Sequence, residues 1–545
     1  MNRQHVMVGF LIAALTLAAI PYPLPARAAP PARPLADFDG DNYDDLVIGV
    51  PYEAIGSAGT AGAVHALYGA PGTGLSAAGS QLWHQDIDGV LETAEAGDEF
   101  GFALAVADFD GNSFLDLAVG VHGEAVGFTP TAGAVHVFYG TAAGLSADQN
   151  EIWHQSAPGI EDEAEADDRF GWALTAGDFD GDGYGDLAIG VLWEDVGTPA
   201  VENAGAVHVI YGSAGGLTAT GNQVWYEGVN GVLGTAGAQD QFGHTLGAGD
   251  FDRDGHDDLV IGVPFDDLGS NPDSGVVHVL YGSASGLIGR SAERWVQGSN
   301  SMTDDDEAGD HFGQAVATGD MNRDGYDDLA VGVPYEDVGN PAVENAGAVH
   351  FVFGSAGRLT AAGNWLHYEP TVPGIVAPEA HDNLGLSLAS GDYDSNGFTD
   401  VAIGVPGEEN DVAKSNAGAV QVLYFSRTPV VISLWDQDDS GVQDLAEAGD
   451  GFGRSLAAGD FDGDGYADLA IGVPWEDILD PVVTNAGAVH VLYGSASGIG
   501  EAREAFWHQA ITGIGGSPEA EDRFGLALAA VPSPRLKIYL PLIQL

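Results

Sequence analysis

The chain carries many short runs of apolar residues, and turns rich in glycine and acidic residues separate them. In the run GAVHVLYG at 487–494, successive residues would point to opposite faces, with the period of a half-buried β-strand. The run LAIGV at 469–473 also indicates a strand, and no helical periodicity is evident after residue 30. The pattern therefore predicts an all-β protein.

These runs recur with a period of about 70 residues. Each unit contains a segment such as FGRSLAAGD (452–460), then an acidic loop, then the LAIGV-type and GAVHVLYG-type runs, and last a run with one tryptophan. Four strands per unit are typical of a β-propeller blade, and stacked blades bury a core that one sheet cannot bury alone. The frequent Gly and Ala would let neighbouring blades approach closely. The loops begin at Asp37, Asp108, Asp178, Asp250, Asp320, Asp392 and Asp460.

The two ends of the repeat array are complementary. The array begins with an acidic loop that no FG segment precedes, and it ends with an FG segment, FGLALAAV at 524–531, that no acidic loop follows. We therefore expect a seven-bladed propeller of four-stranded blades at 29–534, a ring that the C-terminal strand closes by joining the N-terminal blade.

Each loop has the spacing D-x-D-x-D-G-x-x-D or a close variant. Positions 1, 3, 5 and 9 offer side-chain oxygens and position 7 a backbone carbonyl, a ligand set that favours Ca²⁺ over Zn²⁺. Unlike an EF-hand, position 12 is apolar, as at Ile471, because a strand follows. The predicted metal ligands are Asp37, Asp39, Asp41, Tyr43, Asp45; Asp108, Asp110, Asn112, Phe114, Asp116; Asp178, Asp180, Asp182, Tyr184, Asp186; Asp250, Asp252, Asp254, His256, Asp258; Asp320, Asn322, Asp324, Tyr326, Asp328; Asp392, Asp394, Asn396, Phe398, Asp400; and Asp460, Asp462, Asp464, Tyr466, Asp468.

The seven loops are not equivalent. Four keep four carboxylates, two replace one carboxylate by Asn322 or Asn396, and the loop at Asp108 has Asn112 and Ser113 at positions 5 and 6. We expect that loop to bind most weakly. The alternative is that the loops are acidic β-turns without metal, but alternating carboxylates would then repel one another. The formal charge of −65, from 81 acidic and 16 basic residues, would fall to about −51 with seven Ca²⁺ bound.

The combination of FG, D-x-D-x-D-G-x-x-D-L-A-x-G-V-P and GAV resembles the FG-GAP repeat of the integrin α-chain β-propeller over residues 30–531. The resemblance implies up to seven structural Ca²⁺ ions in the loops between the first two strands of each blade, on the face opposite the ligand-binding loops. The usual Gly-Ala-Pro is Gly-Val-Pro here.

The N-terminus carries Arg3, an apolar run at 6–20 and the small-residue site Ala26-Arg27-Ala28. This order predicts a signal peptide at 1–28 and a secreted or cell-surface protein; an uncleaved membrane anchor is the alternative. The apolar tail at 535–545 is too short to span a membrane, so we expect no transmembrane span in the mature chain. The chain contains no cysteine, which leaves bound metal as a means of stabilisation.

Other residues also recur once per repeat. A carboxylate two residues before each FG aromatic and another after each Val-Pro position lie opposite the calcium loops; they are interpreted as caps of loop amides, or alternatively as an acidic rim for a basic partner. Histidines at equivalent strand positions, such as His278, are interpreted as packing residues and not a zinc site. The tryptophans are interpreted as outer-strand anchors and occur at Trp83, Trp153, Trp225, Trp295, Trp365, Trp435 and Trp507.

The strongly acidic composition argues against nucleic acid as a partner. No G-x-S-x-G, H-E-x-x-H or phosphate-binding glycine motif occurs, and no cysteine nucleophile is available. We therefore expect a non-enzymatic, monomeric extracellular binding or adhesion module for a protein or glycan ligand. The alternatives are a propeller enzyme of the polysaccharide lyase or glycosidase type that acts at one mouth of the ring, and a structural module that assembles through its C-terminal tail.

Overall fold

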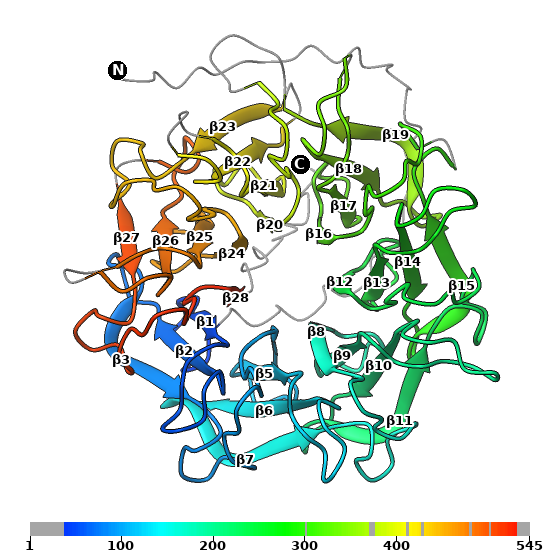
Figure 1. Ribbon diagram of the computed structural model, residues 1–545, viewed down its shortest axis with the longest axis horizontal. Helices are drawn as coiled ribbons and strands as arrows, with labels where there is room; N and C mark the ends of the chain where they lie inside the picture. Colours follow the sequence, from blue (N-terminus) through cyan, green and yellow to red (C-terminus); the bar gives the residue numbers. More distant parts are fainter. Residues whose placement is uncertain are drawn as a thin grey trace, which may run out of the picture.

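Each repeat folds into one four-stranded antiparallel sheet, and seven such sheets surround a central axis as the blades of a β-propeller (Figure 1). All regular elements among the described residues are strands, so the predicted all-β, seven-bladed fold is confirmed. The computed structural model describes residues 37–530 except 300–301, 340, 370–376, 410–413, 427–429, 479–481 and 501–502.

We number the blades 1 to 7 in chain order and give their strands from the axis outward. Blades 1 to 4 contain β28 (Ala527–Ala529), β1 (Leu46–Val50), β2 (Ala63–Tyr68), β3 (Ser76–Trp83); β4 (Leu104–Ala107), β5 (Asp116–Val121), β6 (Ala134–Thr141), β7 (Gly144–Trp153); β8 (Phe170–Gly177), β9 (Asp186–Val191), β10 (Ala206–Tyr211), β11 (Thr218–Trp225); and β12 (Thr245–Gly249), β13 (Asp258–Val263), β14 (Val276–Tyr281), β15 (Ile288–Trp295). Blades 5 to 7 contain β16 (Ala315–Gly319), β17 (Asp328–Val333), β18 (Ala348–Phe353), β19 (Thr360–His367); β20 (Leu388–Gly391), β21 (Asp400–Val405), β22 (Ala419–Tyr424), β23 (Val431–Trp435); and β24 (Ser455–Gly459), β25 (Asp468–Val473), β26 (Ala488–Leu492), β27 (Glu504–Trp507).

The ring closes by strand exchange between the two ends of the array. β28 pairs antiparallel with β1, with Val47 opposite Ala529 and Gly49 opposite Ala527. Blade 1 therefore combines one strand from the end of the chain with three from its start, and the predicted closure is confirmed. Closure also covers the edge that β1 would otherwise expose.

Two glycines of the repeat mark the place where neighbouring blades meet. A Cβ built on Gly262 of β13 would lie 2.2 Å from the carbonyl oxygen of Gly313, the glycine of the FG pair in blade 5. The equivalent distance is 2.1–2.3 Å at all seven junctions. Because real Cβ atoms do not approach an oxygen so closely, any larger residue would push the blades apart.

The strand histidines pack against the FG phenylalanines. The ring of His278 lies 5.5 Å from that of Phe242, and six blades contain this pair at 5.3–5.6 Å. In blade 6 both partners change together, to Gln421 and Leu384. Burial lowers the pKa of His65 to about 4, so a neutral imidazole fills the core. The interpretation as packing residues is confirmed.

The tryptophans lie on the outer strands, as interpreted from the sequence, but one of them has a shifted register. Trp295 lies opposite Val277 in blade 4, but the equivalent Val349 in blade 5 lies opposite His367, and Trp365 lies opposite Phe351. Trp365 therefore occupies a position two residues earlier in its strand. Counting one tryptophan per repeat could not reveal this shift.

The predicted signal peptide at 1–28 and the C-terminal tail at 535–545 lie outside the described residues. A search of the described residues for a helix long and apolar enough to cross a membrane found none.

Candidate functional site

The seven acidic loops join the first and second strands of the blades and therefore lie at one end of the ring, which we call the loop face. In blade 1 the loop at 37–45 leads into β1, while β28 supplies the first strand. The opposite end carries the FG pairs and the loops between second and third strands, and we call it the mouth face.

Each acidic loop wraps around its own carboxylates. In blade 3, the Gly183 amide donates to Asp178 Oδ2 at 3.1 Å, and the Tyr184 amide donates to Asp182 Oδ1 at 3.0 Å. Both bonds, from positions 6 and 7 to positions 1 and 5, occur in all seven loops. Asn112 and Asn396 accept the second bond as Asp182 does, so the loops share one conformation despite their different charges.

This conformation brings carboxylates together in the way a cation needs. In each of four loops, three carboxylates offer oxygens within 4.8 Å of one another; the sets are Asp37/Asp39/Asp41, Asp108/Asp110/Asp116, Asp178/Asp180/Asp186 and Asp250/Asp252/Asp254. Asp252 Oδ1 and Asp460 Oδ1 are buried without a hydrogen-bond partner among the described residues. Burial, then Asp41 and Asp37, raise the pKa of Asp39 to about 6. Crowded oxygen donors with orphaned atoms fit a hard cation such as Ca²⁺.

The aspartate at position 9 has a second role that the sequence did not indicate. Asp468 Oδ2 accepts from the Phe461 amide and Oδ1 from the Gly494 amide, both at 2.9 Å. It therefore joins the start of its loop to the end of the third strand. All seven position-9 aspartates make both bonds. Burial raises the pKa of Asp468 to about 9. The carbonyl ligands predicted at position 7 stay a prediction.

Neighbouring loops are linked into a closed ring. The Asp257 amide donates to the Asp178 carbonyl of the preceding loop at 2.8 Å, and the Asp44 amide closes the ring on the Asp460 carbonyl at 3.2 Å. The equivalent bond occurs at all seven junctions. Whatever stabilises one loop therefore also stabilises the junction with the next blade.

In two loops an aspartate already pairs with an arginine. Arg358 Nε lies 3.9 Å from Asp252 Oδ2, and Arg503 Nη1 donates to Asp462 Oδ2. Counting carboxylates in the sequence missed these arginines because they come from turns elsewhere in the fold. Arg503 also lies over the Tyr493 ring, with its Cζ atom 4.1 Å from the ring centroid, which shows why it points toward the loop.

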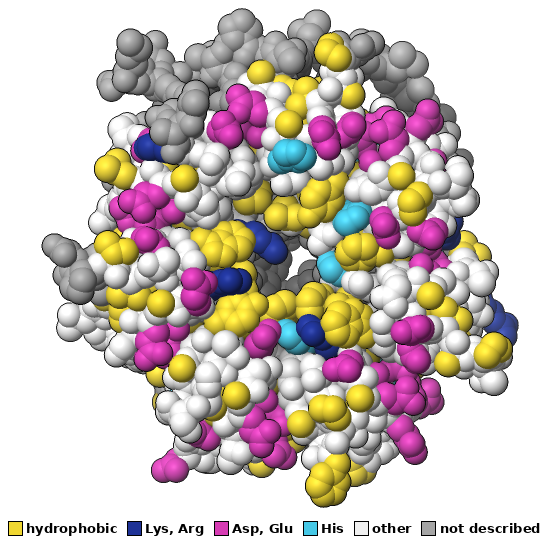
Figure 2. Space-filling model, in the orientation of Figure 1, with side chains coloured by type: hydrophobic (Ala, Val, Ile, Leu, Met, Phe, Trp, Pro, Cys, Tyr) yellow, Lys and Arg dark blue, Asp and Glu magenta, His cyan; other side chains and the backbone are white. Residues whose placement is uncertain are grey.

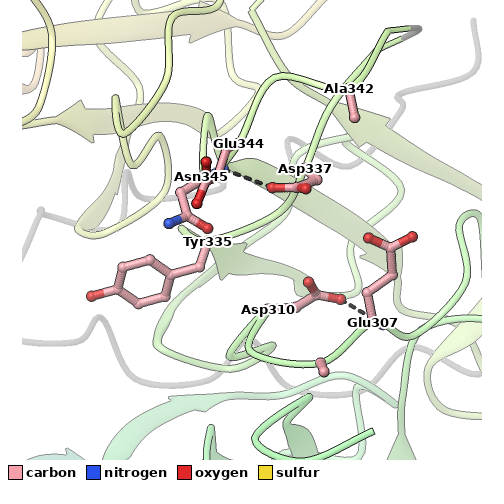
Figure 3. A pocket seen from close by; sticks show the side chains of 8 residues that line it. Glu307, Asp310, Tyr335, Asp337, Ala342, Glu344 and Asn345 are labelled. Atoms are coloured by element: carbon pink, nitrogen blue, oxygen red, sulfur yellow. Dashed lines mark hydrogen bonds between the residues drawn. The ribbon is translucent and has the colours of Figure 1, made fainter.

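On the mouth face, the interpretation as caps of loop amides is confirmed for the aspartates before the FG pairs, whereas five of the carboxylates after Val-Pro bind side chains of the preceding blade. The aspartate before each FG pair accepts a loop amide three residues earlier; Asp310 accepts from Glu307 at 2.7 Å (Figure 3). The carboxylate after Val-Pro accepts from a glutamine of the preceding blade at five junctions, as when Gln437 donates to Glu476 Oε2 at 2.7 Å. Burial, then Asp450 and Asp444, raise the pKa of Glu476 to about 9.

The two remaining junctions replace the glutamine by glutamate and compensate for it. Glu227 Oε1 lies 2.7 Å from His278 Nε2, and Arg294 Nη2 donates to the neighbouring Asp266 at 3.2 Å. At the second junction, Gln421 donates to Glu369 Oε1 at 2.5 Å. The same strand site is occupied by His in blade 4 and Gln in blade 6, so each junction keeps a buried hydrogen bond.

A cavity of about 450 Å³ opens on this face between blades 4 and 5 (Figure 3). Glu307, Asp310, Asp337 and Glu344 contribute carboxylates to its lining, and Asp337 Oδ1 accepts from the Asn345 amide at 2.8 Å. Two of these four carboxylates thus hold loop amides in place, in agreement with the capping role.

Comparison with known proteins gives a consistent picture. Integrin alpha-PS2 of Drosophila melanogaster is 30% identical over 275 residues, which cover 48% of this chain and 16% of the integrin. Phosphatidylinositol-glycan-specific phospholipase D of Bos taurus is 26% identical over 458 residues, which cover 79% of this chain and 51% of that protein. The match thus spans about half of the length of the phospholipase D and less than a fifth of the integrin. A periplasmic gluconolactonase of Pseudomonas aeruginosa superimposes with a TM-score of 0.43 at 12% identity, over 90% of this chain and 100% of that one, too low to support an argument.

The FG-GAP repeat family matches one segment in every blade, and the matched segments are residues 34–67, 100–138, 170–210, 242–280, 312–352, 384–423 and 452–492. Each segment contains an acidic loop and the second-strand glycine of a blade junction, and the last six also contain the glycine of an FG pair. The chain belongs to the FG-GAP repeat family.

Proposed function

We propose that this protein is a secreted, calcium-binding β-propeller that acts as an extracellular binding or adhesion module for a protein or glycan. The observation that carries the proposal is the set of seven loops that present carboxylates in one shared conformation. The similarity to integrin α-chains supports the binding role, and the whole integrin extends well beyond the matched part.

Calcium would be held by the side chains of positions 1, 3 and 5, with position 9 and the position-7 carbonyl beside them. When bound, Ca²⁺ supplies positive charge where three carboxylates lie within 4.8 Å of one another. The chain itself supplies the preformed loop and the bonds between neighbouring loops. Its role is therefore structural: the ion would stabilise one loop and, through the inter-loop bond, the junction with the next blade.

The loops should differ in affinity. Those at Asp37 and Asp178 keep four carboxylates, and no arginine contact is found for either among the described residues. Those at Asp250 and Asp460 also keep four carboxylates but share position 3 with Arg358 or Arg503. The loop at Asp108 has Asn112 at position 5 and should be the weakest. Affinities of roughly 10⁻⁴ to 10⁻³ M are typical of extracellular calcium modules.

Calorimetric titration of the chelated protein with CaCl₂ tests the metal proposal. We expect several sites, with loss of one strong site in an Asp178→Ala variant. An Asp148→Ala variant, which changes the same residue type on the outer strand β7, is the matched control. Absence of calcium binding, or identical titrations for Asp178→Ala and the wild type, would contradict the proposal.

Arrays of glycans and of extracellular proteins, probed with and without calcium, test the binding role. We expect one class of ligand to be retained in millimolar calcium and released by a chelator. Calcium-independent turnover of an arrayed polysaccharide would contradict the binding role and favour the alternative below.

The second candidate is an enzyme that acts at one mouth of the ring, of the polysaccharide lyase or glycosidase type. The observation in its favour is the similarity to a phospholipase D over 79% of this chain. A glycosidase needs two carboxyl groups roughly 5 to 10 Å apart around the scissile bond. Assays for lyase, glycosidase and phosphodiester hydrolysis by the purified chain discriminate between the two candidates.

Secretion is part of the proposal and rests on the sequence of residues 1–28. Sequencing the N-terminus of protein recovered from outside the cell should give Ala29 as the first residue. Recovery with Met1 or another residue within the apolar run would contradict cleavage at this site.

A further inference from the structure

The central opening of the ring gathers side chains of a kind that is rare elsewhere on this protein. Figure 2 shows hydrophobic, His and Lys/Arg side chains around the opening, while most Asp and Glu side chains lie farther out. They come from three positions of the repeat on the mouth face: the residue after Val-Pro, the residue before the FG pair and the residue after it. The sevenfold pattern, so regular in the acidic loops, breaks at these positions.

Half of the opening is lined by rings in contact with one another. Their centroids are 4.6–6.0 Å apart from one ring to the next, and all six are half-buried. The rings come from blades 2 to 5, and blade 6 contributes Leu386 and Gly407 at the equivalent places. We call this set the ring arc: Phe102, Trp172, His244, Phe265, His311 and Tyr335.

Three arginines complete the opening. The Arg169 guanidinium carbon lies 3.9 Å from the centroid of Trp193, and that of Arg523 lies 4.8 Å from the centroid of Tyr52. Burial and then Glu99 raise the pKa of Tyr52 above its ordinary value. The positive charges of Arg523, Arg454 and Arg169 partly oppose this rise. The three arginines come from blades 3, 7 and 1, at the two repeat positions that flank the FG pair.

These cations lack the partners that other basic residues of the protein have. Arg294, Arg503 and Lys414 each pair with a carboxylate. Within the part of the chain that the structure describes, neither Arg169 nor Arg454 has a carboxylate within 4.0 Å, and Arg523 has only the exposed Glu521 at 3.5 Å.

Two of these arginines also have a nitrogen atom that lacks a hydrogen-bond acceptor in the described part of the chain. The Nε atoms of Arg169 and Arg523 are buried with no hydrogen-bond acceptor among the described residues. Glu99, which precedes the FG pair of blade 2, lies 2.9 Å from His122. In a protein with 81 acidic and 16 basic residues, the three repeat positions around the opening hold one carboxylate, Glu99, and three arginines.

We propose that the opening binds a small cyclic carboxylate, in which the guanidinium groups of Arg169, Arg454 and Arg523 hold the carboxylate and the ring arc packs against the ring of the ligand. Guanidinium groups prefer carboxylates and can bind them in a bidentate way, and aromatic walls with a few charged groups are typical of small-molecule sites. A long polyanion is disfavoured because the rest of the surface carries the charge of −65.

Two sources share this chemistry, a uronic acid sugar and an aromatic acid, and the experiment separates them. Calcium-loaded full-length protein is titrated calorimetrically with glucuronate and with benzoate, and with glucose and benzamide as the uncharged counterparts. We expect saturable binding at one site for at least one of the two acids, and at least tenfold weaker binding of its uncharged counterpart. Equal affinity for acid and counterpart, or no binding of either acid, overturns the proposal.

Variants then place the site. Because hydrogen bonds to charged groups contribute about 1.5–3 kcal/mol, Arg454→Met and Arg169→Met should each weaken binding roughly tenfold to a hundredfold. Arg290→Met, on the outer strand β15 and exposed, removes the same charge elsewhere and should change nothing. Unchanged binding in both Arg169→Met and Arg454→Met, or an equal loss in Arg290→Met, overturns the proposal. The use of two mouth variants, each checked by its melting temperature, keeps the test decisive if one of them fails to fold.

The inference rests on the proposed binding role and specifies where and what the mouth binds. Its failure is distinguishable from failure of that role. Calcium-dependent retention on an array with no carboxylate binding at the mouth overturns only the present inference, whereas a chain without any calcium or array binding overturns the role itself.

Discussion

The two faces of the ring come from the same seven repeats but differ in how strictly they follow them. On the loop face, the same hydrogen bonds occur seven times, and a backbone bond links every loop to the next. On the mouth face, the capping aspartates repeat, but the polar pairs between blades change at two junctions and the residues around the opening change in nearly every blade.

This difference separates two tasks. A feature that each blade needs in order to join its neighbour must recur in every blade, and the acidic loops do. A site for one ligand at the axis needs different groups from different blades, because all seven blades surround the same point. The regular face is therefore best explained by stability and the irregular one by recognition.

Removal of calcium should have the largest effect, because it acts on all seven loops at once. With Kd near 10⁻³ M and tenfold more calcium, each site contributes about 1.4 kcal/mol, or about 10 kcal/mol for seven. For about 500 residues this corresponds to a melting temperature roughly 10 °C lower after chelation. Differential scanning calorimetry with and without a chelator measures it. An unchanged melting temperature would contradict a structural role of calcium in the acidic loops.

The next largest effect should come from the irregular junction of the mouth face. Arg294→Leu leaves Glu227 and Asp266 buried without their cation, which should cost about 3–5 kcal/mol of unfolding free energy. Chemical denaturation in saturating calcium is the measurement. Arg290→Leu, on the same strand but exposed, is the control and should change stability by less than about 0.5 kcal/mol.

A rescue sharpens the same comparison. Glu227→Gln with Asp266→Glu rebuilds the Gln–Glu pair that five other junctions contain, so stability should return in the Arg294→Leu background. Failure of the rescue would mean that Arg294 acts on stability by some route other than these two carboxylates.

The ordinary junctions should show a smaller, pH-dependent effect. The pKa of Glu476 is raised to about 9, by burial first and then by Asp450 and Asp444, so the folded protein holds a proton that the unfolded chain releases above about pH 4.5. Stability from this group is complete below that pH and is lost as pH rises through about 9. Glu476→Gln should therefore gain about 1–3 kcal/mol relative to the wild type between mildly acidic and mildly alkaline pH.

Thermal melts across this pH range, in saturating calcium, give the measurement. Gln437, which donates to Glu476, stays in place in the variant and can donate to the new amide oxygen. A difference between variant and wild type that does not change with pH would show that Glu476 is ionised in the folded protein.

The smallest effect should come from improving the weakest loop. Asn112→Asp restores the fourth carboxylate at position 5, although it gives up the bond from the Asn112 amide to the Gly140 carbonyl. A tenfold gain in affinity at one site is about 1.4 kcal/mol, or a melting temperature roughly 1 °C higher in calcium. The gain must disappear in chelator; if it persists there, the loop is stabilised by something other than the metal.

Much of the fold could be predicted because the number of sequence repeats and the runs within each repeat indicate the number of blades and their strands. The complementary ends of the array predicted that β28 would join β1, and the frequent Gly and Ala predicted close approach of the blades. The second role of Asp468 was missed because its partner Gly494 lies 26 residues away, at the end of another strand. The shifted register of Trp365 could not be predicted, because only its pairing with Phe351 shows it.

The candidate sites divide in the same way. Loop conformation depends on residues within nine positions of one another, so the sequence by itself determined seven oxygen-rich loops and the propeller that carries them. Only the tertiary structure decided that Arg358 and Arg503 reach two of the loops, that Arg294 compensates Glu227, and that Arg169 and Arg523 lie over aromatic rings at the central opening. The physical reason is that ring closure places residues from blades 1, 3 and 7 around one axis, and no local pattern encodes a distance across it.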